Sequence, residues 1–160
     1  MIDFCKMEEK DISFLTGLLN EKDIIASLHN AVKNYEEWLE TYNKYWKNNS
    51  DESHFIICFD GIPVGWLRLN GLSNTETAWI AMLAVSPEQQ NKGIGHCAVA
   101  FSEEYAKSKG FTKIGIHTTD ENFIAQKLYR KCGYSIVEYG KCTTGDGANR
   151  MGYSYMKNLI

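Results

Sequence analysis

The segment at residues 90–95, with the sequence QNKGIG, is the part of the chain whose residue types and spacing point most directly to chemistry. It follows the apolar run at residues 83–85 and precedes a helical pattern over residues 96–109. Because Gly93 and Gly95 lack a Cβ, an anion can come close to the main chain, where unpaired amides and the helix dipole favour negative charge. The segment therefore predicts a site for a phosphate-bearing ligand.

Two common phosphate-binding motifs fit this segment poorly. A P-loop needs Gly-Lys-Ser/Thr at the helix start, whereas Gly95 is followed by His96 and Cys97. A dinucleotide-binding motif follows the first strand and needs a third glycine, whereas this segment lies in mid-chain with Ala98 at that position. For these six residues alone, a helix start that uses glycines for tight packing is the structural alternative.

A second segment, residues 122–134 with the sequence NFIAQKLYRKCGY, completes a recognisable pair. Residues 90–95 match the pattern Q/R-x-x-G-x-G/A, and residues 122–134 match N-x-x-A-x-x-L-Y-x-K-x-G-Y/F. With both motifs in this order, the chain resembles the GNAT family of acyl-CoA-dependent N-acetyltransferases. The motifs cover roughly the second half of the chain, and the first half resembles the family in the order of its expected elements.

The resemblance implies where acyl-CoA would bind. In the family, the strands that correspond to residues 79–85 and 113–118 splay apart, and the pantetheine arm lies in the opening. The backbone of residues 83–85 would pair with pantetheine amides as an added strand does, and residues 90–96 would hold the pyrophosphate. A plain buried strand is the structural alternative for residues 83–85. The expected cosubstrate contacts are Leu83, Ala84, Val85, Gln90, Asn91, Lys92, Gly93, Ile94, Gly95, His96, Asn122, Ala125 and Tyr129.

Tyr129 is the expected proton donor to the departing thiolate. On a helix, Asn122, Ala125 and Tyr129 lie at i, i+3 and i+7, so the amide and the phenol share one face. A phenol with a reference pKa of about 10 stays protonated at neutral pH and can donate as charge develops on the sulfur. The resemblance implies the same role, because a tyrosine at this position commonly donates this proton in the family. A half-buried tyrosine packed on the sheet is the structural alternative.

The sequence leaves open which group removes the proton from an ammonium acceptor. Many family members place a glutamate on the strand that reads WIAMLAV here, at residues 79–85, and this strand holds no acid. Ordered water and backbone carbonyls are one alternative, because positioning alone provides a large share of the barrier reduction. The candidate side chains are Glu36, Glu37, Glu40, Glu76, His117, Asp120 and Glu121.

Cys132 allows a different reaction route, because a thiol three residues after Tyr129 could act as the nucleophile of a ping-pong mechanism. A cysteine on an apolar helix face, with no histidine in its motif, is more typical of a core residue. The sequence therefore favours direct attack in a ternary complex. His96, directly after Gly95, is expected to contact the phosphates or to lie in solvent.

Length and composition fit one domain over residues 1–160, because 160 residues with 44% hydrophobic content can bury a core without disulfide bonds or a structural metal. The five cysteines are odd in number and lack zinc-type spacing, which favours reduced thiols, a cytosolic location and no bound metal. No signal-like start and no membrane-spanning apolar run occurs, so we expect a soluble cytoplasmic protein without a membrane partner. The net charge of −3 argues against nucleic acid as a partner.

Hydrophobic periodicity predicts an α/β fold of the α+β type, with a mixed, largely antiparallel sheet of about seven strands and about four helices. Asp60-Gly61 predicts a tight hairpin, and an aromatic stripe predicts that the second helix packs on the core. The resemblance adds a splayed pair of strands. Strands are expected at residues 2–6, 54–59, 62–70, 76–85, 113–118, 134–139 and 149–157, and helices at 8–19, 34–47, 96–109 and 122–132.

The acceptor would be recognised by the variable parts of the chain, which are residues 21–34, the early helix with Glu37 and Trp38, and the loop at 142–149 with Asp146. Carboxylates and aromatic faces suit a cation. We therefore expect acetyl transfer from acetyl-CoA to a primary amine of a small cationic acceptor, such as a polyamine or an aminosugar. A peptide N-terminus or lysine acceptor, an acyl-CoA-binding sensor without turnover, and a homodimeric assembly stay open as alternatives.

Overall fold

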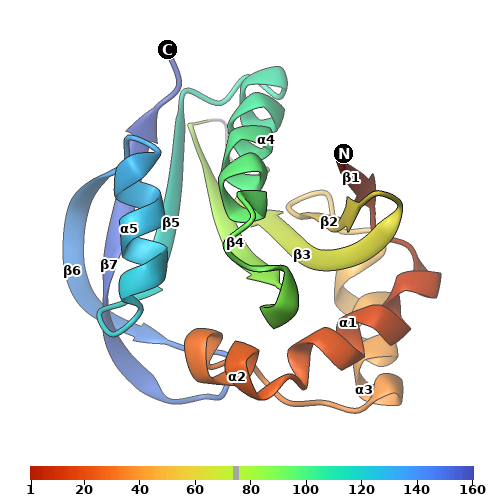
Figure 1. Ribbon diagram of the computed structural model, residues 1–160. Coiled ribbons are helices and arrows are strands. Elements are labelled where there is room, and N and C mark those ends of the chain that lie inside the picture. The colour runs from red at the N-terminus through yellow and green to blue at the C-terminus, as the bar shows by residue number, and fades with distance from the viewer. Residues whose placement is uncertain (74–75) are drawn as a thin grey trace.

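A mixed sheet organises the computed structural model, which describes residues 1–73 and 76–160 (Figure 1). Its strands are β1 (Ile2–Lys6), β2 (Ser53–Phe59), β3 (Ile62–Asn70), β4 (Thr77–Val85), β5 (Lys113–Thr119), β6 (Ser135–Thr143) and β7 (Asn149–Asn158), in the order β1-β2-β3-β4-β5-β7-β6. The α-helices are α1 (Ile12–Leu19), α2 (Lys22–Leu28), α3 (Tyr35–Thr41), α4 (Ile94–Ser108) and α5 (Phe123–Lys131). Short helical turns of other types are η1 (Glu9–Asp11), η2 (Tyr42–Trp46) and η3 (Pro87–Gln89).

Neighbouring strands of this sheet are antiparallel, except that β4 and β5 are parallel. The connection from β4 to β5 passes through α4, because parallel neighbours need a crossover. β2 and β3 form a hairpin in which Asp60 (φ 50°) and Gly61 (φ 80°) both have left-handed backbone, as a type I′ turn requires. The expected mixed, largely antiparallel sheet and its hairpin are confirmed.

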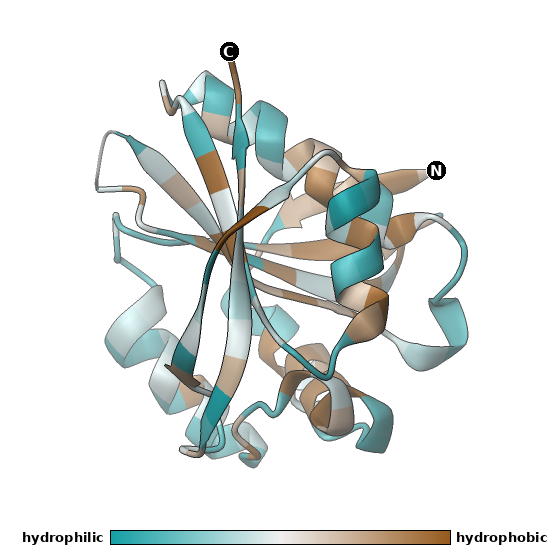
Figure 2. Ribbon diagram, turned by 90° about the vertical axis from the view of Figure 1, so that its left-hand side faces the viewer, coloured by the Kyte–Doolittle hydropathy of each residue, from teal (hydrophilic) through white to brown (hydrophobic). Residues whose placement is uncertain are grey.

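Helices cover both faces of the sheet and create two hydrophobic clusters. The first cluster joins β5 residues such as Ile114 and Ile116 to α4 and to Tyr129 of α5. The second joins Leu15 of α1 and Trp38 of α3 to the other face of the sheet. Figure 1 shows α4 and α5 in front of the strands and α1, α2 and α3 grouped below them. In Figure 2, hydrophobic colours run through the strands at the centre and also mark parts of the helices.

The helices of the first half differ in detail from those expected. The turn that was expected to begin a helix near residue 8 is the 3₁₀ turn η1, and α1 begins at Ile12. The expected helix over residues 34–47 is α-helical only to Thr41 and continues as a π-turn, in which the Lys47 amide donates to the Tyr42 carbonyl at 2.8 Å. Within this turn Trp46 is buried and stacks on His54, with ring centroids 4.4 Å apart. The π-turn therefore coincides with the packing of Trp46 on His54.

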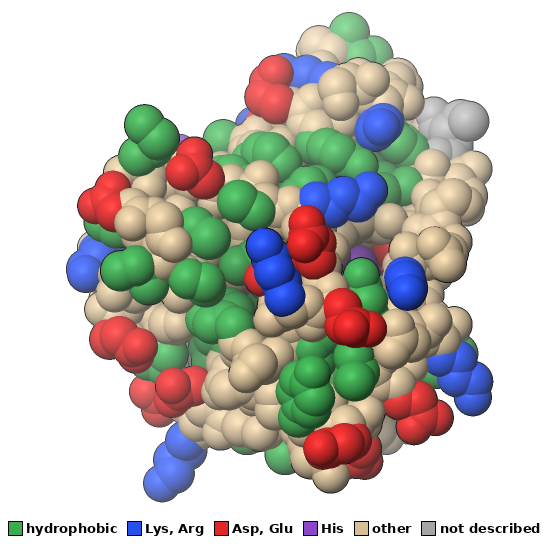
Figure 3. Space-filling model, turned by 90° about the vertical axis from the view of Figure 1, so that its right-hand side faces the viewer, with side chains coloured by type: hydrophobic (Ala, Val, Ile, Leu, Met, Phe, Trp, Pro, Cys, Tyr) green, Lys and Arg blue, Asp and Glu red, His purple; other side chains and the backbone are tan. Residues whose placement is uncertain are grey.

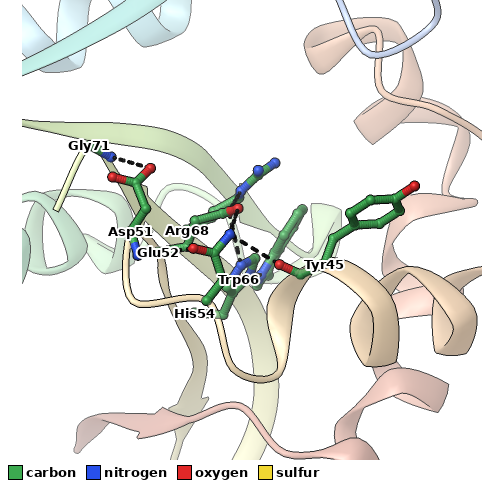
Figure 4. A network of polar contacts seen from close by, with 8 residues as sticks. Tyr45, Asp51, Glu52, His54, Trp66, Arg68 and Gly71 are labelled. Carbon is green, nitrogen blue, oxygen red and sulfur yellow. Dashed lines mark hydrogen bonds and ion pairs between the residues drawn. The ribbon is translucent and has the colours of Figure 1, made fainter. Parts of the chain in front are cut away.

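A buried polar network ties the start of β2 to β3 beneath this turn (Figure 4). Trp66 Nε1 donates to His54 Nδ1 at 3.2 Å, while Glu52 Oε1 lies 3.3 Å from His54 Nε2 and accepts from Arg68 Nε. Burial lowers the pKa of His54 below its ordinary value. Burial alone would raise the pKa of Glu52, but its contacts with His54 and Arg68 outweigh burial and lower it. The network therefore holds a neutral imidazole beside an ionised carboxylate.

The surface is mixed in charge on the side that carries the N-terminal elements. Figure 3 shows Lys and Arg side chains scattered among Asp and Glu side chains on this face, without a broad coloured patch of one sign. Such a face offers no basic stripe of the kind that tracks a phosphate backbone. Within residues 1–73 and 76–160, no helix has the length and apolar composition needed to cross a membrane.

Candidate functional site

The pairing of β4 with β5 stops partway along both strands, and this creates the central feature of the site. The parallel pairs run from Thr77↔Lys113 to Ile80↔Ile116 and go no further. Beyond Ile80, β4 keeps its pairing with β3 on the other side, through a bulge at Ala81 and on to Val85. Figure 1 shows the two strands close together at one end and diverging towards the other. The β4 edge over residues 81–85 therefore faces the opening, and no strand among residues 1–73 and 76–160 pairs with it there.

Leu83, Ala84 and Val85 occupy this unpaired stretch of β4. Ala84 is buried against the cluster of α1 and α3, whereas Leu83 and Val85 are partly buried against the cluster of α4. All three pair with β3 at their other edge. Unpaired backbone donors and acceptors along a strand edge are a template for an extended ligand. An extended ligand could therefore pair with this edge, and the backbone contact expected at residues 83–85 stays a prediction.

The loop after β4 turns the chain into the start of α4 at the wide end of the opening. The Gln90 side chain donates to the Val85 carbonyl at 3.0 Å, which fixes the loop to the end of the strand. Asn91 (φ 63°) and Gly93 (φ 80°) both have left-handed backbone, and Gly93 is the N-cap of α4. A β-carbon at Gly93 would meet no atom within 4 Å, so the backbone angle rather than space favours glycine.

The first turn of α4 presents amides that have no partner within the helix. They belong to Ile94, Gly95 and His96, and the exposed Lys92 lies just before them. Gly95 has a second role that the sequence did not reveal: a β-carbon there would lie 3.2 Å from Leu128 Cδ2 on α5. The missing side chain therefore lets α5 pack closely on the start of α4, which brings the two motifs together.

The second motif begins at the N-terminus of α5. Asn122 is the N-cap, and its Oδ1 accepts from the Ala125 amide at 3.1 Å. Its Nδ2 donates to the Ser27 carbonyl of α2 at 3.4 Å. Asn122 therefore lies just before the helix rather than within it, and its side chain is occupied by capping and by contact with α2. Ala125 is partly buried against the cluster of α4.

Tyr129 lies deep on α5, on the α4 side of the sheet. Its side chain is 5% exposed and packs beside Tyr134 and Tyr155, with ring centroids 6.2 and 5.9 Å away. Among the described residues, no hydrogen bond involves its hydroxyl. Burial, reinforced by the nearby Cys132, raises the pKa of Tyr129 above its ordinary value. The phenol therefore stays protonated, as a proton donor must.

A different set of residues lies on the opposite face of β5. Ile116 points to the α4 side, so its neighbours Gly115 and His117 point away from it. A β-carbon at Gly115 would lie 2.6 Å from the Trp79 ring, so only glycine leaves room for this indole. His117 is exposed, and its Nδ1 lies 3.1 Å from the Ser154 hydroxyl of β7. The second face of the opening thus carries an indole and an oriented imidazole.

The acidic residues considered as bases are dispersed by the fold. Glu36, Glu37 and Glu40 are exposed on α3, and Glu37 reaches back to the Asn34 amide in a capping box. Glu76 pairs with Lys113 at 3.3 Å, before β4 begins. Asp120 accepts from the Tyr139 hydroxyl at 2.9 Å, and Glu121 is exposed beside it.

Cys132 has a neighbour that its own motif did not suggest. Its sulfur lies 3.6 Å from Nδ1 of His96, which comes from the first motif. Burial is the main cause of the raised pKa of Cys132, so the thiol remains protonated and is a poor nucleophile.

Within the described ranges, no three His, Cys, Asp or Glu side chains gather as a metal site would require. Two surface hollows of about 320 and 290 Å³ lie at the C-terminal end of α4 and beside η2, away from the β4–β5 opening.

A family model described as the Acetyltransferase (GNAT) family matches residues 23–134, more than half of the chain. The chain belongs to the GNAT family. An uncharacterised N-acetyltransferase of Methanocaldococcus jannaschii is 29% identical over 112 residues, which are 66% of this chain and 49% of that relative. A spermidine N(1)-acetyltransferase of Vibrio cholerae is 24% identical over 136 residues, 84% of this chain and 78% of the relative.

The fold of this GNAT chain is also that of a solved relative. The crystal structure of spermidine N-acetyltransferase from Vibrio cholerae, in complex with CoA and spermine, matches with a TM-score of 0.85 and 21% identity. The match covers 99% of this chain and 95% of that one. The chain nevertheless spans only about half the length of the Methanocaldococcus relative.

Sequence reasoning identified the GNAT motifs but missed residues on the other face of the opening. Ser154, Glu138 and Gly152 lie outside both motifs, and only the register of β5, β7 and β6 brings them near His117. The hydrophobic pattern of a strand does not specify which residue of the neighbouring strand lies opposite each of its own residues. Gly115 within an apolar strand was the available signal, because such a glycine often marks a close approach.

Proposed function

We propose that this protein transfers an acetyl group from acetyl-CoA to a primary amine of a small cationic acceptor, by direct attack in a ternary complex. One observation carries the proposal: the unpaired edge of β4 leads directly to the free amides at the start of α4. An extended pantetheine arm has amides for the first feature, and a pyrophosphate has negative charge for the second. Family membership supports the same cosubstrate.

The cosubstrate would enter between the α4 side and the opposite face of β5. Its phosphates would contact the amides of residues 94–96, and its thioester would lie near the point where the strands separate. Tyr129 lies on α5 within the hydrophobic cluster on this side, and burial keeps its hydroxyl protonated, which supports it as the proton donor. As the C–S bond breaks, the phenol would give its proton to the thiolate sulfur.

The acceptor would approach from the other face, beneath α2. Two contacts hold α2 there: Asn122 Nδ2 donates to the Ser27 carbonyl, and the Asp146 amide donates to the His29 carbonyl at 2.9 Å. The indole of Trp79 provides an aromatic surface on this side, which suits an ammonium group. The crystal structure of the Vibrio cholerae relative in complex with CoA and spermine supports a polyamine as the first acceptor class to test.

Asp146 contributes less to acceptor charge than the sequence suggested. Its carboxylate accepts from Thr144, and it pairs with Arg150 at 2.9 Å. These hydrogen bonds, with that of Thr144 first, lower the pKa of Asp146 below its ordinary range. The charge of Asp146 is therefore neutralised by contacts within its own loop. We infer that Asp120 and Glu121, at the end of β5, are better placed to attract a cation.

Calorimetric titration with acetyl-CoA, followed by thiol release across a panel of amines, tests the function. The panel contains spermidine, an aminoglycoside, a lysine-containing peptide and a peptide with a free N-terminus. We expect binding of acetyl-CoA and thiol release that depends on a small polycationic amine. Release with peptides alone would favour the peptide acceptor, and binding without release under any amine would favour a sensor. Absence of acetyl-CoA binding would contradict the proposal.

A further inference from the structure

Three polar side chains form a row across β5, β7 and β6 on the face of the sheet opposite Tyr129. Ser154 of β7 is paired with His117 of β5 on one side and with Glu138 of β6 on the other. Residues paired in this way project to the same face. The imidazole Nδ1 lies 3.1 Å from the Ser154 hydroxyl. The register therefore orders a histidine, a hydroxyl and a carboxylate side by side.

His117 occupies the position on β5 where the opening begins. The last paired residues are Ile80 and Ile116, so His117 is the first residue of β5 beyond the point of separation. Ile116 and its β7 partner Tyr155 face the cluster that contains Tyr129. His117 must face the other way because side chains alternate along a strand. An acyl group at this point would have the phenol on one side and the imidazole on the other.

We propose that His117 accepts the proton of the acceptor ammonium, and that Ser154 is the positioning residue that orients its ring. With Nδ1–H donating to the Ser154 hydroxyl, Nε2 keeps a free lone pair. The ring lies over Ser154 and Gly152 of β7 and is exposed, so the acceptor would reach Nε2 from this open face of the sheet. This inference rests on the proposed acetyl transfer. It assigns the base that the strand at residues 79–85, which lacks an acid, does not supply.

The proton balance of this route is complete. Nε2 of His117 takes one proton from the ammonium, and the freed nitrogen lone pair forms the C–N bond with the thioester carbon. The C–S bond then breaks, and the thiolate receives a proton from Tyr129. The second proton lost by the nitrogen returns to the phenolate through water. His117 releases its proton to solvent, so the net products are the amide, the free thiol and one proton.

The surroundings of the imidazole suit this role. The side chain is exposed at its outer edge, but partial burial against β7 lowers the pKa of His117, while the negative charge of Glu138 opposes that shift. The other groups identified on neighbouring strands, Ser154 of β7 and Trp79 of β4, carry no charge at neutral pH. The imidazole is therefore mostly neutral at pH 7 and able to accept a proton, and Glu138 stabilises the imidazolium that results.

Gly152 leaves the space that the ring occupies. A β-carbon at this position would lie 2.7 Å from His117 Nε2 and 2.4 Å from the Thr118 carbonyl oxygen. A larger residue would displace the ring or the strand. The close approach of the Thr118 carbonyl already favours glycine here, and the same missing side chain leaves room for the ring above β7.

The test compares His117→Gln with the unmodified enzyme over a range of pH, with spermidine as acceptor. We expect kcat at pH 7 to fall about 10²-fold, as loss of a general base does. We also expect the acidic limb of the pH profile to disappear and the deficit to shrink as pH rises. Acetyl-CoA binding should not change.

Acceptor basicity separates a proton acceptor from a structural residue. Hydroxylamine is mostly unprotonated at neutral pH, so His117→Gln should use it nearly as fast as the unmodified enzyme does, once the enzyme-free reaction of hydroxylamine with the thioester has been subtracted. Ser154→Ala should give a smaller loss of kcat with spermidine, and its deficit should depend on pH and on the amine in the same way. A deficit that is equal for both amines and at every pH would overturn the inference, as would an unchanged kcat. If the unmodified enzyme binds acetyl-CoA but acetylates no amine, the proposed function fails and this inference fails with it.

Discussion

Tyr129 is held by aromatic neighbours, while its hydroxyl has no hydrogen-bond partner among the described residues. Tyr129→Phe removes one oxygen and keeps the ring packing. Because the phenol is the proposed proton donor, we expect kcat to fall about 10²-fold with little change in the acetyl-CoA dissociation constant. Steady-state thiol release together with calorimetry measures both quantities.

Tyr134→Phe is the matched control for this change. Tyr134 lies beside Tyr129, and its hydroxyl donates to Glu103 at 3.1 Å, away from the opening. This variant should keep kcat and lose about 1 kcal/mol of unfolding free energy with its hydrogen bond. Equal losses of kcat in the two variants would mean that the tyrosine cluster acts only through packing, and the assigned role of Tyr129 would be wrong.

At the scale of elements, Asn122 joins α5 to α2 through a single side chain. Asn122→Ala removes both the cap and the bond to Ser27, so we expect about 1 kcal/mol of lost stability and a higher KM for the amine. Asn122→Asp keeps a capping oxygen but has no amide to donate. Compared with Asn122→Ala, Asn122→Asp should therefore recover the lost unfolding free energy, while its KM for the amine stays high. Thermal unfolding and amine saturation curves measure the two effects, and full recovery of KM by aspartate would contradict the role of the α2 contact.

Elements with a clear hydrophobic period could be predicted from the sequence, and weakly patterned ones could not. The buried face of α1, the β2–β3 hairpin and both motif helices were expected near their observed limits. α2 was not expected, because it has seven residues, only Ile24 fully buried and no side-chain cap. β6 continues to Thr143, beyond the expected end at residue 139, since its pairing with β7 rather than any buried face defines it.

Only part of the candidate site could be predicted from the sequence, because some of its features depend on contacts between distant segments. The motifs identified local features, such as the left-handed Gly93 at the start of α4 and Tyr129 on α5. The close approach of Gly95 to Leu128, and the row formed by His117 and Ser154, depend on contacts between distant segments. Sheet register and helix packing create these contacts, and a single sequence does not specify either.

At the scale of the whole molecule, the buried His54 makes folding stability depend on pH. Its pKa is lowered from an ordinary value of about 6.5, so below that pH the unfolded chain binds a proton that the folded chain does not. Stability should therefore fall as the pH drops below about 6.5, by up to about 1.4 kcal/mol per pH unit. His117, whose pKa is also lowered, adds to the same slope. Urea unfolding at several pH values measures it.

His54→Gln should reduce this slope whatever it does to absolute stability, because it removes one of the two shifted imidazoles. The lowered pKa of Glu52 adds a further loss at lower pH, as its carboxylate becomes protonated. A slope that is the same in His54→Gln and in the unmodified protein would show that the buried network does not control acid sensitivity.

Hydrogen–deuterium exchange with and without acetyl-CoA is the most direct test of the central claim that the β4–β5 opening binds the cosubstrate. The β4 edge over residues 81–85 and the first turn of α4 have free amides before binding. We expect acetyl-CoA to slow exchange in both segments, with little change in the distant β1. Protection confined to other parts of the chain, with these two segments unchanged, would contradict the account.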